Sequence, residues 1–333
     1  MNNAAAALLA VLLVPVIPAV AQRDQAPVLS PTTPAYVQRV APAVVGIQTK
    51  IPLDRPSVLT LGPVRAGSGV IFDPAGYVAT VGYILTDAAR IQVSLRDGRT
   101  VSARFVGQDF ESGIGIAKLE GAGPWPHAPL GNSATVGVGD PVAIVGVDSE
   151  NALTATQGTI REIKRFTGYW EYLLERAFIV SPANPSFGGS PLINPQGEVI
   201  GVTSLRLGDP PHVNLAIPIE YFIAVREELL REGRVKSRPP RPWLGLYTVE
   251  AAEGLVVAGA SPSGPAIEAG FERGDVIIRL NGEKVESQED FYRKIWKTDV
   301  GAEVKVVIVR DGKFQVIGVR TVDRHAIGGA PRN

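Results

Sequence analysis

The sequence contains no cysteine, which excludes disulfide bonds, thiolate nucleophiles, cysteine-type zinc sites and cysteine-ligated clusters. Histidine is also scarce: His127, His212 and His325 are far apart in sequence, so little is available for a metal site or a histidine acid–base centre. No surplus of positive charge exists, because 33 lysines and arginines balance 33 aspartates and glutamates. A nucleic-acid-binding protein needs such a surplus to displace counterions. We therefore expect no cofactor, no metal ion and no nucleic-acid partner.

Glycine and proline, by contrast, are abundant, with 36 and 27 residues among 333. These numbers exceed the need of a helical bundle and suit short strands joined by turns. At roughly 100–200 residues per domain, the chain is long enough for about two domains, each with its own core. The composition thus predicts a soluble, β-rich protein.

The first residues are typical of an export signal. Residues 4–21 are apolar, two prolines interrupt them, and the small residues Ala19 and Ala21 form a cleavage pattern. We predict a signal peptide over residues 1–21, followed by a flexible segment over residues 22–35. An uncleaved membrane anchor is the alternative, and the prolines disfavour it. No later segment is apolar for long enough to span a bilayer, so we expect an exported protein, periplasmic or secreted.

Residues 36–232 alternate short apolar runs with turn-forming residues. Asp97-Gly98 follows a period-two strand and is a strong hairpin signal, and Gly76 ends a proline-containing turn. Roughly a dozen such runs favour a sandwich or barrels. The first convincing helical spacing, Tyr221, Val225 and Leu229, predicts one helix that ends at Gly233.

Residues 233–242 are basic and proline-rich without any periodic pattern, which predicts a solvated linker. The unit over residues 243–323 has its own apolar runs, and residues 324–333 form a tail. Within this unit, Ser287 and Asp290 resemble a capping box that opens a helix with Phe291 and Ile295 on one face. An α+β domain of about 80 residues is the prediction.

Several segments together resemble the HtrA (Deg) family of exported, trypsin-like serine proteases that carry a PDZ domain. The segments are Val40 to Ile47, Gly67 to Tyr77, Leu130 to Ser133, Val138 to Asp140, Asn184-Pro185, Pro191-Leu192, Gly197 to Gly201 and Ala216 to Pro218. The resemblance implies a mainly β fold: a chymotrypsin-like pair of six-stranded β-barrels with the active site between them, followed by an α+β PDZ domain. It assigns residues 36–232 to the protease domain and residues 243–323 to PDZ.

At the three positions where this family carries its catalytic triad, the sequence has other residues. Counting from Gly76 places Tyr83 at the histidine, and the residue before the strand that normally follows the aspartate is Gly113. The nucleophile loop has the family's length, with Gly188 at the serine. A triad needs an alcohol, an imidazole and a carboxylate, and a tyrosine with a pKa near 10 is a poor proton acceptor at neutral pH. We therefore expect an inactive homologue.

Two neighbouring serines leave an alternative open. Ser186 and Ser190 lie two residues to either side of Gly188, and either is a conceivable nucleophile in a rearranged centre. A displacement of several ångströms would spoil an attack geometry that tolerates about 1 Å. The alternative is thus a serine endopeptidase of periplasmic protein quality control with a rearranged active site.

The PDZ pattern is intact. In such domains a short loop offers successive backbone N–H groups to a peptide's terminal carboxylate, and the peptide adds as a strand at a sheet edge. The resemblance implies a groove made by this loop, the strand after it and one helix wall: Trp243, Leu244, Gly245, Leu246, Tyr247, Val249, Phe291 and Ile295.

These expectations combine into an exported pseudoprotease that binds polypeptides without hydrolysing them, as a scaffold, adaptor or chaperone. Its expected partners are unfolded or C-terminal peptide segments. The resemblance also implies a homo-trimer, to which Tyr36-Val37 would contribute, or an assembly with an active paralogue.

Overall fold

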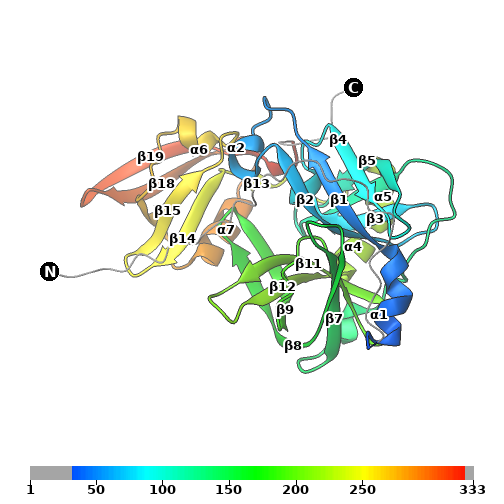
Figure 1. Ribbon diagram of the computed structural model, residues 1–333. Coiled ribbons are helices and arrows are strands. Elements are labelled where there is room, and N and C mark those ends of the chain that lie inside the picture. The colour runs from blue at the N-terminus through cyan, green and yellow to red at the C-terminus, as the bar shows by residue number, and fades with distance from the viewer. Residues whose placement is uncertain (1–31, 327–333) are drawn as a thin grey trace.

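The computed structural model describes residues 32–326, in which two closed, antiparallel β-barrels are followed by a smaller domain (Figure 1). The predicted signal peptide and most of the predicted tail lie outside these residues. The first barrel has the strand order β1-β2-β3-β6-β5-β4. Its strands are β1 (Val44–Lys50), β2 (Val64–Ile71), β3 (Tyr77–Val81), β4 (Arg90–Ser94), β5 (Thr100–Gln108) and β6 (Ile114–Leu119).

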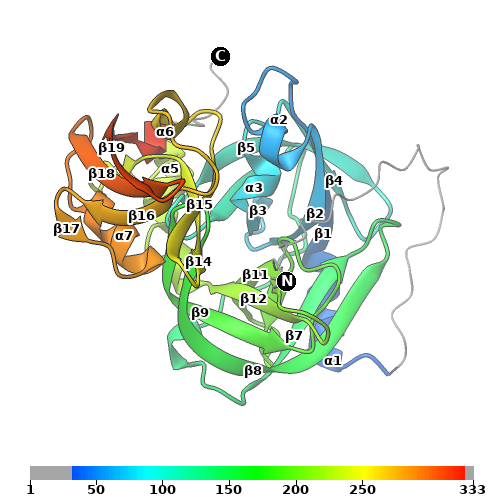
Figure 2. The same cartoon turned by 90° about the vertical axis from the view of Figure 1, so that its left-hand side faces the viewer.

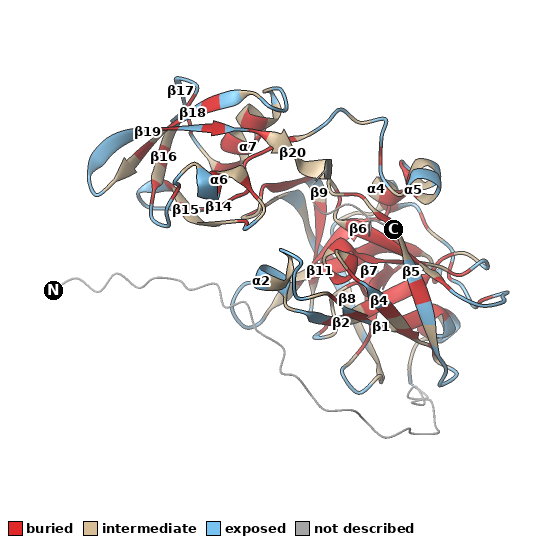
Figure 3. Cartoon of the chain, turned by 90° about the horizontal axis from the view of Figure 1, so that it is seen from above, coloured by how far each residue is buried: buried red, intermediate tan, exposed pale blue. Residues whose placement is uncertain are grey.

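The second barrel has the order β10-β11-β12-β9-β8-β7, so the predicted pair of six-stranded barrels is confirmed. Its strands are β7 (Pro141–Val147), β8 (Leu153–Gly168), β9 (Tyr172–Ser181), β10 (Pro191–Ile193), β11 (Val199–Leu207) and β12 (Val213–Pro218). One apolar core joins both barrels, because Ile71 of the first and Val145 and Ile217 of the second belong to the same buried cluster (Figure 3). This shared core fixes the relative position of the two barrels.

Short helices cover the barrels. They are α1 (Ala35–Val40), η1 (Ala41–Ala43), α2 (Val58–Leu61), α3 (Gly82–Leu85), η2 (Ser133–Thr135), α4 (Glu220–Ile223) and α5 (Arg226–Glu232). The single helix expected around Val225 is wrong: Val225 has φ −121° and ψ 5°, which separates α4 from α5. The predicted stop at Gly233 is confirmed by its left-handed φ of 71°. Val37 is fully buried in the barrel core and is therefore not available to another subunit.

The C-terminal domain contains a six-stranded antiparallel sheet packed on α7, with a separate core. Its elements are β14 (Leu246–Ala251), β15 (Gly254–Ala260), α6 (Pro265–Glu268), β16 (Val276–Leu280), β17 (Glu283–Lys284), α7 (Gln288–Trp296), β18 (Glu303–Arg310) and β19 (Lys313–Arg320). The strands β13 (Pro242–Trp243) and β20 (Val322–Asp323) pair at its base, before η3 (Arg324–Ala326). Ser287 caps α7 as predicted, accepting the N–H of Asp290 at 3.0 Å.

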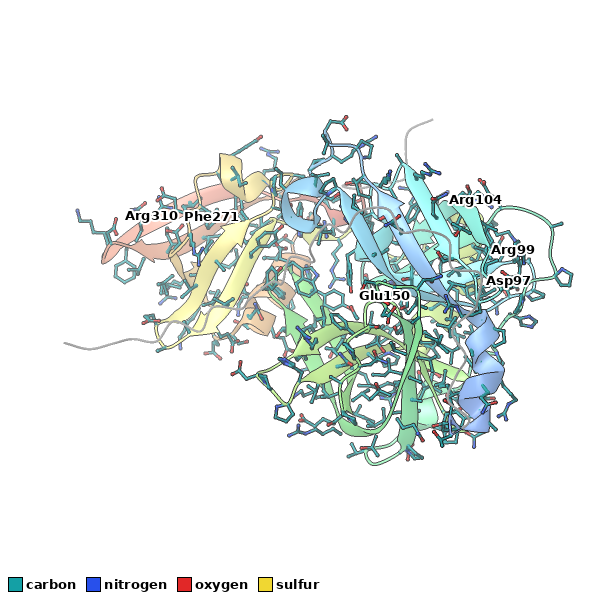
Figure 4. The ribbon with its side chains drawn as sticks, in the orientation of Figure 1. Asp97, Arg99, Arg104, Glu150, Phe271 and Arg310 are labelled. Atoms are coloured by element: carbon teal, nitrogen blue, oxygen red, sulfur yellow. The ribbon has the colours of Figure 1, made fainter. Side chains whose placement is uncertain are left out.

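Polar contacts bridge the turns at both ends of the molecule (Figure 4). At the β4–β5 turn, Arg99 Nη2 lies 2.7 Å from Asp97 Oδ2. In the C-terminal domain, Arg310 Nε lies 2.7 Å from the buried Asp275 Oδ1. Among the residues from 32 to 326, no helix is both long and apolar enough to cross a membrane.

The predicted linker, residues 233–242, is exposed at Arg234, Lys236, Ser237, Pro239 and Pro240, but two of its arginines form contacts that its composition does not predict. Arg238 Nη1 lies 2.6 Å from Asp109 Oδ1 and 3.2 Å from Glu111 Oε2. Arg241 lies 3.6 Å from Glu111 and stacks on the ring of Trp296, 3.5 Å from its centroid. The arginines therefore dock this segment on the first barrel and on the C-terminal domain.

Candidate functional site

Tyr83 and Gly188 meet where the two barrels face each other. Tyr83 lies on α3, directly after β3 of the first barrel, and its hydroxyl donates to the carbonyl of Ser204 on β11, at 2.9 Å. A Cβ built on Gly188 would lie 3.1 Å from Tyr83 Oη, the only atom within 4 Å apart from chain neighbours. Burial of the phenol raises the pKa of Tyr83 above its ordinary value, so this hydroxyl keeps its proton at neutral pH.

Gly113 lies beside the same helix. Its carbonyl accepts the N–H of Gly82 at 2.7 Å, which places position 113 next to the residue that precedes Tyr83. A Cβ on Gly113 would lie 3.3 Å from Tyr172 Oη, and this tyrosine donates to the carbonyl of Ser112. The fold thus brings residues 83, 113 and 188 together, although the three are distant in sequence.

In the loop before β10, which contains Gly188, polar groups form hydrogen bonds with one another. The N–H of Ser186 donates to Asn184 Oδ1 at 2.7 Å, and the buried hydroxyl of Ser190 donates to the carbonyl of Ser186. The carbonyl of Gly188 accepts the N–H of Ser68 at 2.7 Å. An oxyanion hole needs N–H groups aimed at the reacting oxygen. The N–H two residues before Gly188 has an acceptor inside its own loop instead.

The three histidines have their contacts elsewhere. His127 Nδ1 lies 3.2 Å from the carbonyl of Trp125, and His212 Nδ1 lies 2.7 Å from that of Gly208. His325 stacks on Phe110, with ring centroids 5.9 Å apart. Within residues 32–326, no group of three or more acidic or histidine side chains is arranged to hold a metal ion.

A second site lies in the C-terminal domain, at the loop that leads into β14. The N–H groups of Leu244, Gly245 and Leu246 all donate to one carboxylate oxygen, Glu171 Oε1, at 3.2, 2.7 and 2.9 Å. Glu171 belongs to the three-residue turn between β8 and β9 of the second barrel. The fold therefore offers a carboxylate to three converging backbone donors. We call residues 243–246 the carboxylate loop and residues 168–172 the hairpin tip.

The hairpin tip also contacts the edge of β14 (Figure 2). The N–H of Thr248 donates to the carbonyl of Tyr169 at 2.9 Å, and the hydroxyl of Tyr292 on α7 donates to the carbonyl of Gly168 at 2.8 Å. Tyr169 and Tyr247 meet edge to face, with ring centroids 5.5 Å apart. The tip thus lies between β14 and α7.

Burial dominates the electrostatics of Glu171. Removal of its carboxyl from water raises the pKa to about 7, and the three backbone donors and Arg324 oppose that rise. Arg324 lies on η3 and packs its guanidinium over the rings of Trp243 and Phe110, at 4.6 and 5.2 Å from their centroids. A cation is thus held near the carboxylate loop by aromatic packing.

The residues predicted to form the peptide groove differ in their contacts and in their exposure. Leu244, Gly245 and Leu246 supply the N–H donors, Tyr247 contacts the hairpin tip, and Trp243 pairs in β13. Val249 is exposed on β14, at 41%. Phe291 and Ile295 are fully buried in the core of the domain.

The helix face toward β14 carries Gln288 and Tyr292, which sequence reasoning missed. Gln288 Nε2 donates to the carbonyl of Thr248, and Tyr292 Oη lies 3.0 Å from Thr248 Oγ1. Their spacing of four residues could have indicated this face from the sequence, because residues four apart lie on the same side of a helix. The backbone conformation of the loop also requires a glycine at residue 245. Gly245 has φ +80°, and a Cβ there would lie 2.7 Å from Gly264 Cα.

The comparisons with known proteins agree with this architecture. The family model of the trypsin-like peptidase domain matches residues 67–202, and the PDZ domain model matches residues 242–321. Serine endoprotease DegS of Salmonella typhimurium is 31% identical over 306 residues, which cover 84% of this chain and 83% of that protein. The chain belongs to the HtrA (Deg) family. The fold predicted from the resemblance is therefore confirmed, with a PDZ domain at its C-terminal end.

Two further relatives place the chain within the HtrA family. A probable periplasmic serine endoprotease, DegP-like, of Halomonas elongata is 31% identical over 274 residues, and this chain spans only 56% of its length. The solved structure of the HtrA-type protease AlgW with a tripeptide has a TM-score of 0.53 and 26% identity, and it covers 87% of this chain and 98% of its own.

Proposed function

We propose that this HtrA-family chain is a pseudoprotease of the periplasm or the extracellular space. It binds polypeptides through its PDZ domain as a scaffold, adaptor or chaperone, and it does not hydrolyse them. Its relatives include the serine endoprotease DegS and a probable periplasmic serine endoprotease, DegP-like, which supports an exported location.

The observation that carries the first half of the proposal is the contact between Gly188 and Tyr83. Position 188 has no side chain to attack a carbonyl, and the group that faces it is a phenol whose proton is donated to Ser204. Loss of an entire triad lowers turnover by a factor on the order of 10⁶. The internal hydrogen bond of Ser186 N–H removes one donor that would otherwise stabilise an oxyanion.

Peptide binding is supported by the carboxylate loop, where three N–H groups converge on one acceptor. Such convergence is the backbone geometry that captures a terminal carboxylate. In the AlgW structure, an HtrA-type protease is seen with a tripeptide. The resemblance to the HtrA family also implies a homo-trimer, and a mixed complex with an active paralogue is the alternative.

Casein digestion tests the absence of hydrolysis. The purified mature protein should release no fragments under conditions in which an active HtrA protease degrades casein. The competing function, a serine endopeptidase with a rearranged centre, is motivated by Ser186 and Ser190 in the loop of Gly188. Labelling by a fluorophosphonate that disappears in Ser186→Ala or Ser190→Ala would establish that function and overturn this proposal.

A further inference from the structure

Glu171 reaches the carboxylate loop from another domain, 73 to 75 residues away in sequence. We infer that the loop is a carboxylate-binding site that this chain fills in cis: the Glu171 side chain stands where the terminal carboxylate of a peptide would bind. The inference rests on the proposed function, because it concerns the same PDZ groove. The inference adds that the groove is already occupied by the hairpin tip. A peptide must therefore compete with the tip for the carboxylate loop.

The hydrogen bonds have the pattern of a bound peptide. One oxygen of Glu171 receives the N–H groups of Leu244, Gly245 and Leu246, and Thr248 donates to Tyr169. The tip runs from residue 169 to residue 171, while its partners run from residue 248 back to residue 244. The tip is thus antiparallel to β14, and it combines an added backbone segment with a captured carboxylate.

The backbone of the turn gives independent support. Glu171 has φ +57°, a left-handed conformation in which glycine or asparagine is favoured over glutamate. The conformation of the turn by itself therefore does not explain why residue 171 is a glutamate. Glu171 is buried, with only 7% of the residue exposed. Strain of this kind persists where surrounding contacts hold it.

Two cations and a phenol surround the contact, although burial outweighs their effect on the carboxyl. Arg324 and Arg241 are the cations whose charges act on Glu171, and Tyr292 is the third titratable neighbour. The hairpin is tied to α7 by ion pairs beside the groove: Arg165 Nη1 lies 2.9 Å from Glu289 Oε1, and Arg293 pairs with Glu175. The hairpin tip therefore docks as a unit, and its release would uncover the three donors and the β14 edge together.

The deciding variant is Glu171→Gly. Glycine suits φ +57°, so the turn should persist while the carboxylate is lost. The matched control is Asp311→Gly, which removes a carboxylate from a left-handed position, φ +50°, in the exposed β18–β19 turn. The probe is a fluorescein-labelled peptide, Gly-Ser-Gly-Ser-Tyr-Trp-Val, with a free terminal carboxylate, and its amidated twin.

Two readouts are needed. An occupied groove lowers apparent affinity by the fraction of molecules that are open, so a groove filled in nine molecules of ten predicts about tenfold tighter peptide binding in Glu171→Gly. The amidated twin should not bind, and Asp311→Gly should match wild type. Hydrogen exchange of the amides of Leu244, Gly245 and Leu246 should be faster in Glu171→Gly, without any peptide, because their acceptor is gone.

The two readouts separate this inference from the proposed function. Equal exchange and equal peptide affinity in wild type and Glu171→Gly would overturn the occupation by Glu171 and leave peptide binding intact. Faster exchange in Glu171→Gly, with no peptide bound by either protein, would support the occupation and contradict the peptide-binding function. Faster exchange with tighter binding supports both.

Discussion

At the residue scale, the contact of Glu171 with the carboxylate loop combines two opposing effects. A left-handed backbone disfavours a residue with a Cβ by about 1–2 kcal/mol. Three N–H donors act in the other direction, each hydrogen bond contributing about 0.5–1.5 kcal/mol to the neutral carboxyl and about 1.5–3 kcal/mol to the charged one. Desolvation of the carboxyl offsets part of this gain, which is why its pKa rises to about 7. The balance therefore depends on whether Glu171 carries its proton.

This balance makes peptide binding depend on pH. The docked carboxyl has a pKa of about 7 and the released one about 4.5, so docking is strongest when Glu171 is protonated and weakens as pH rises through 7. The terminal carboxylate of a peptide stays ionised throughout this range. Wild type should thus bind the free-carboxylate peptide more tightly at pH 8 than at pH 5.5. Fluorescence anisotropy measures the affinity at each pH.

Glu171→Gly serves as the control for this pH dependence, since it has no side chain to titrate at the loop. Its affinity should change far less over the same range. A wild-type affinity that is constant from pH 5.5 to pH 8, or a parallel change in both proteins, would show that Glu171 does not titrate in competition with the ligand.

At the scale of elements, helix α7 is short and depends on its cap. Ser287 accepts the N–H of Asp290 at 3.0 Å, and the carboxylate of Asp290 reaches back to the N–H of Glu286 at 3.0 Å. The first hydrogen bond of the predicted capping box, from the Asp290 N–H to Ser287, is present. The second differs, because the carboxylate of Asp290 accepts the N–H of Glu286 and not that of Ser287. Phe291 and Tyr292 then place the helix on the core and on β14.

Ser287→Ala should lower the free energy of unfolding of the PDZ domain by about 1 kcal/mol, because one N–H at the helix start loses its acceptor. Urea denaturation, followed by circular dichroism, measures the change. Ser287→Thr keeps a hydroxyl at the cap and should retain most of the stability. If both variants were equally destabilised, packing at residue 287 and not its hydrogen bond would be responsible.

At the scale of the whole molecule, two of the contacts that join the PDZ domain to the barrels involve segments far apart in sequence. One is the hairpin tip between β14 and α7, visible from two directions (Figures 1 and 2). The other is the segment before β13, where Arg238 pairs with Asp109, a carboxylate with only 2% of its surface exposed. Because both contacts lie far from each other in sequence, each restricts a different part of the same interface.

Arg238→Ala should destabilise the protein, because it leaves a buried carboxylate without its cation. The remaining donors to Asp109 are the N–H groups of Glu111 and Ser112, at 3.1 and 3.3 Å. A lost hydrogen bond to a charged group corresponds to about 1.5–3 kcal/mol of unfolding free energy. Chemical denaturation measures it.

Lys284→Ala is the matched control, because Lys284 and Glu286 form an exposed ion pair at 3.7 Å. Such surface pairs contribute about 0–1 kcal/mol. Equal effects of the two substitutions would contradict the idea that Arg238 stabilises the docked segment.

The sequence was sufficient for the local and repetitive features of the molecule. Period-two apolar runs and turn residues such as Gly76 and Gly98 predicted the strands and turns, because alternation and positive φ are properties of a few adjacent residues. The closure of these strands into two barrels was predicted from the resemblance to the HtrA family, and the structure confirms it. The resemblance to the HtrA family, and not the local pattern, located the carboxylate loop and the positions Tyr83, Gly113 and Gly188. The break between α4 and α5 at Val225 was not predicted, because apolar residues at a spacing of four do not reveal the φ angle of a single residue.

The tertiary structure alone decided which partners meet. Nothing near Glu171 in sequence indicates that its carboxylate lies against N–H groups more than 70 residues away, and the basic composition of residues 233–242 gives no sign of Asp109 or Glu111. Hydrogen bonds and desolvation depend on three-dimensional neighbours, so the pKa of Glu171 and the docking of Arg238 exist only in the folded chain. Local pattern fixed the elements of this protein; the packing of the barrels against the PDZ domain determined what fills its groove.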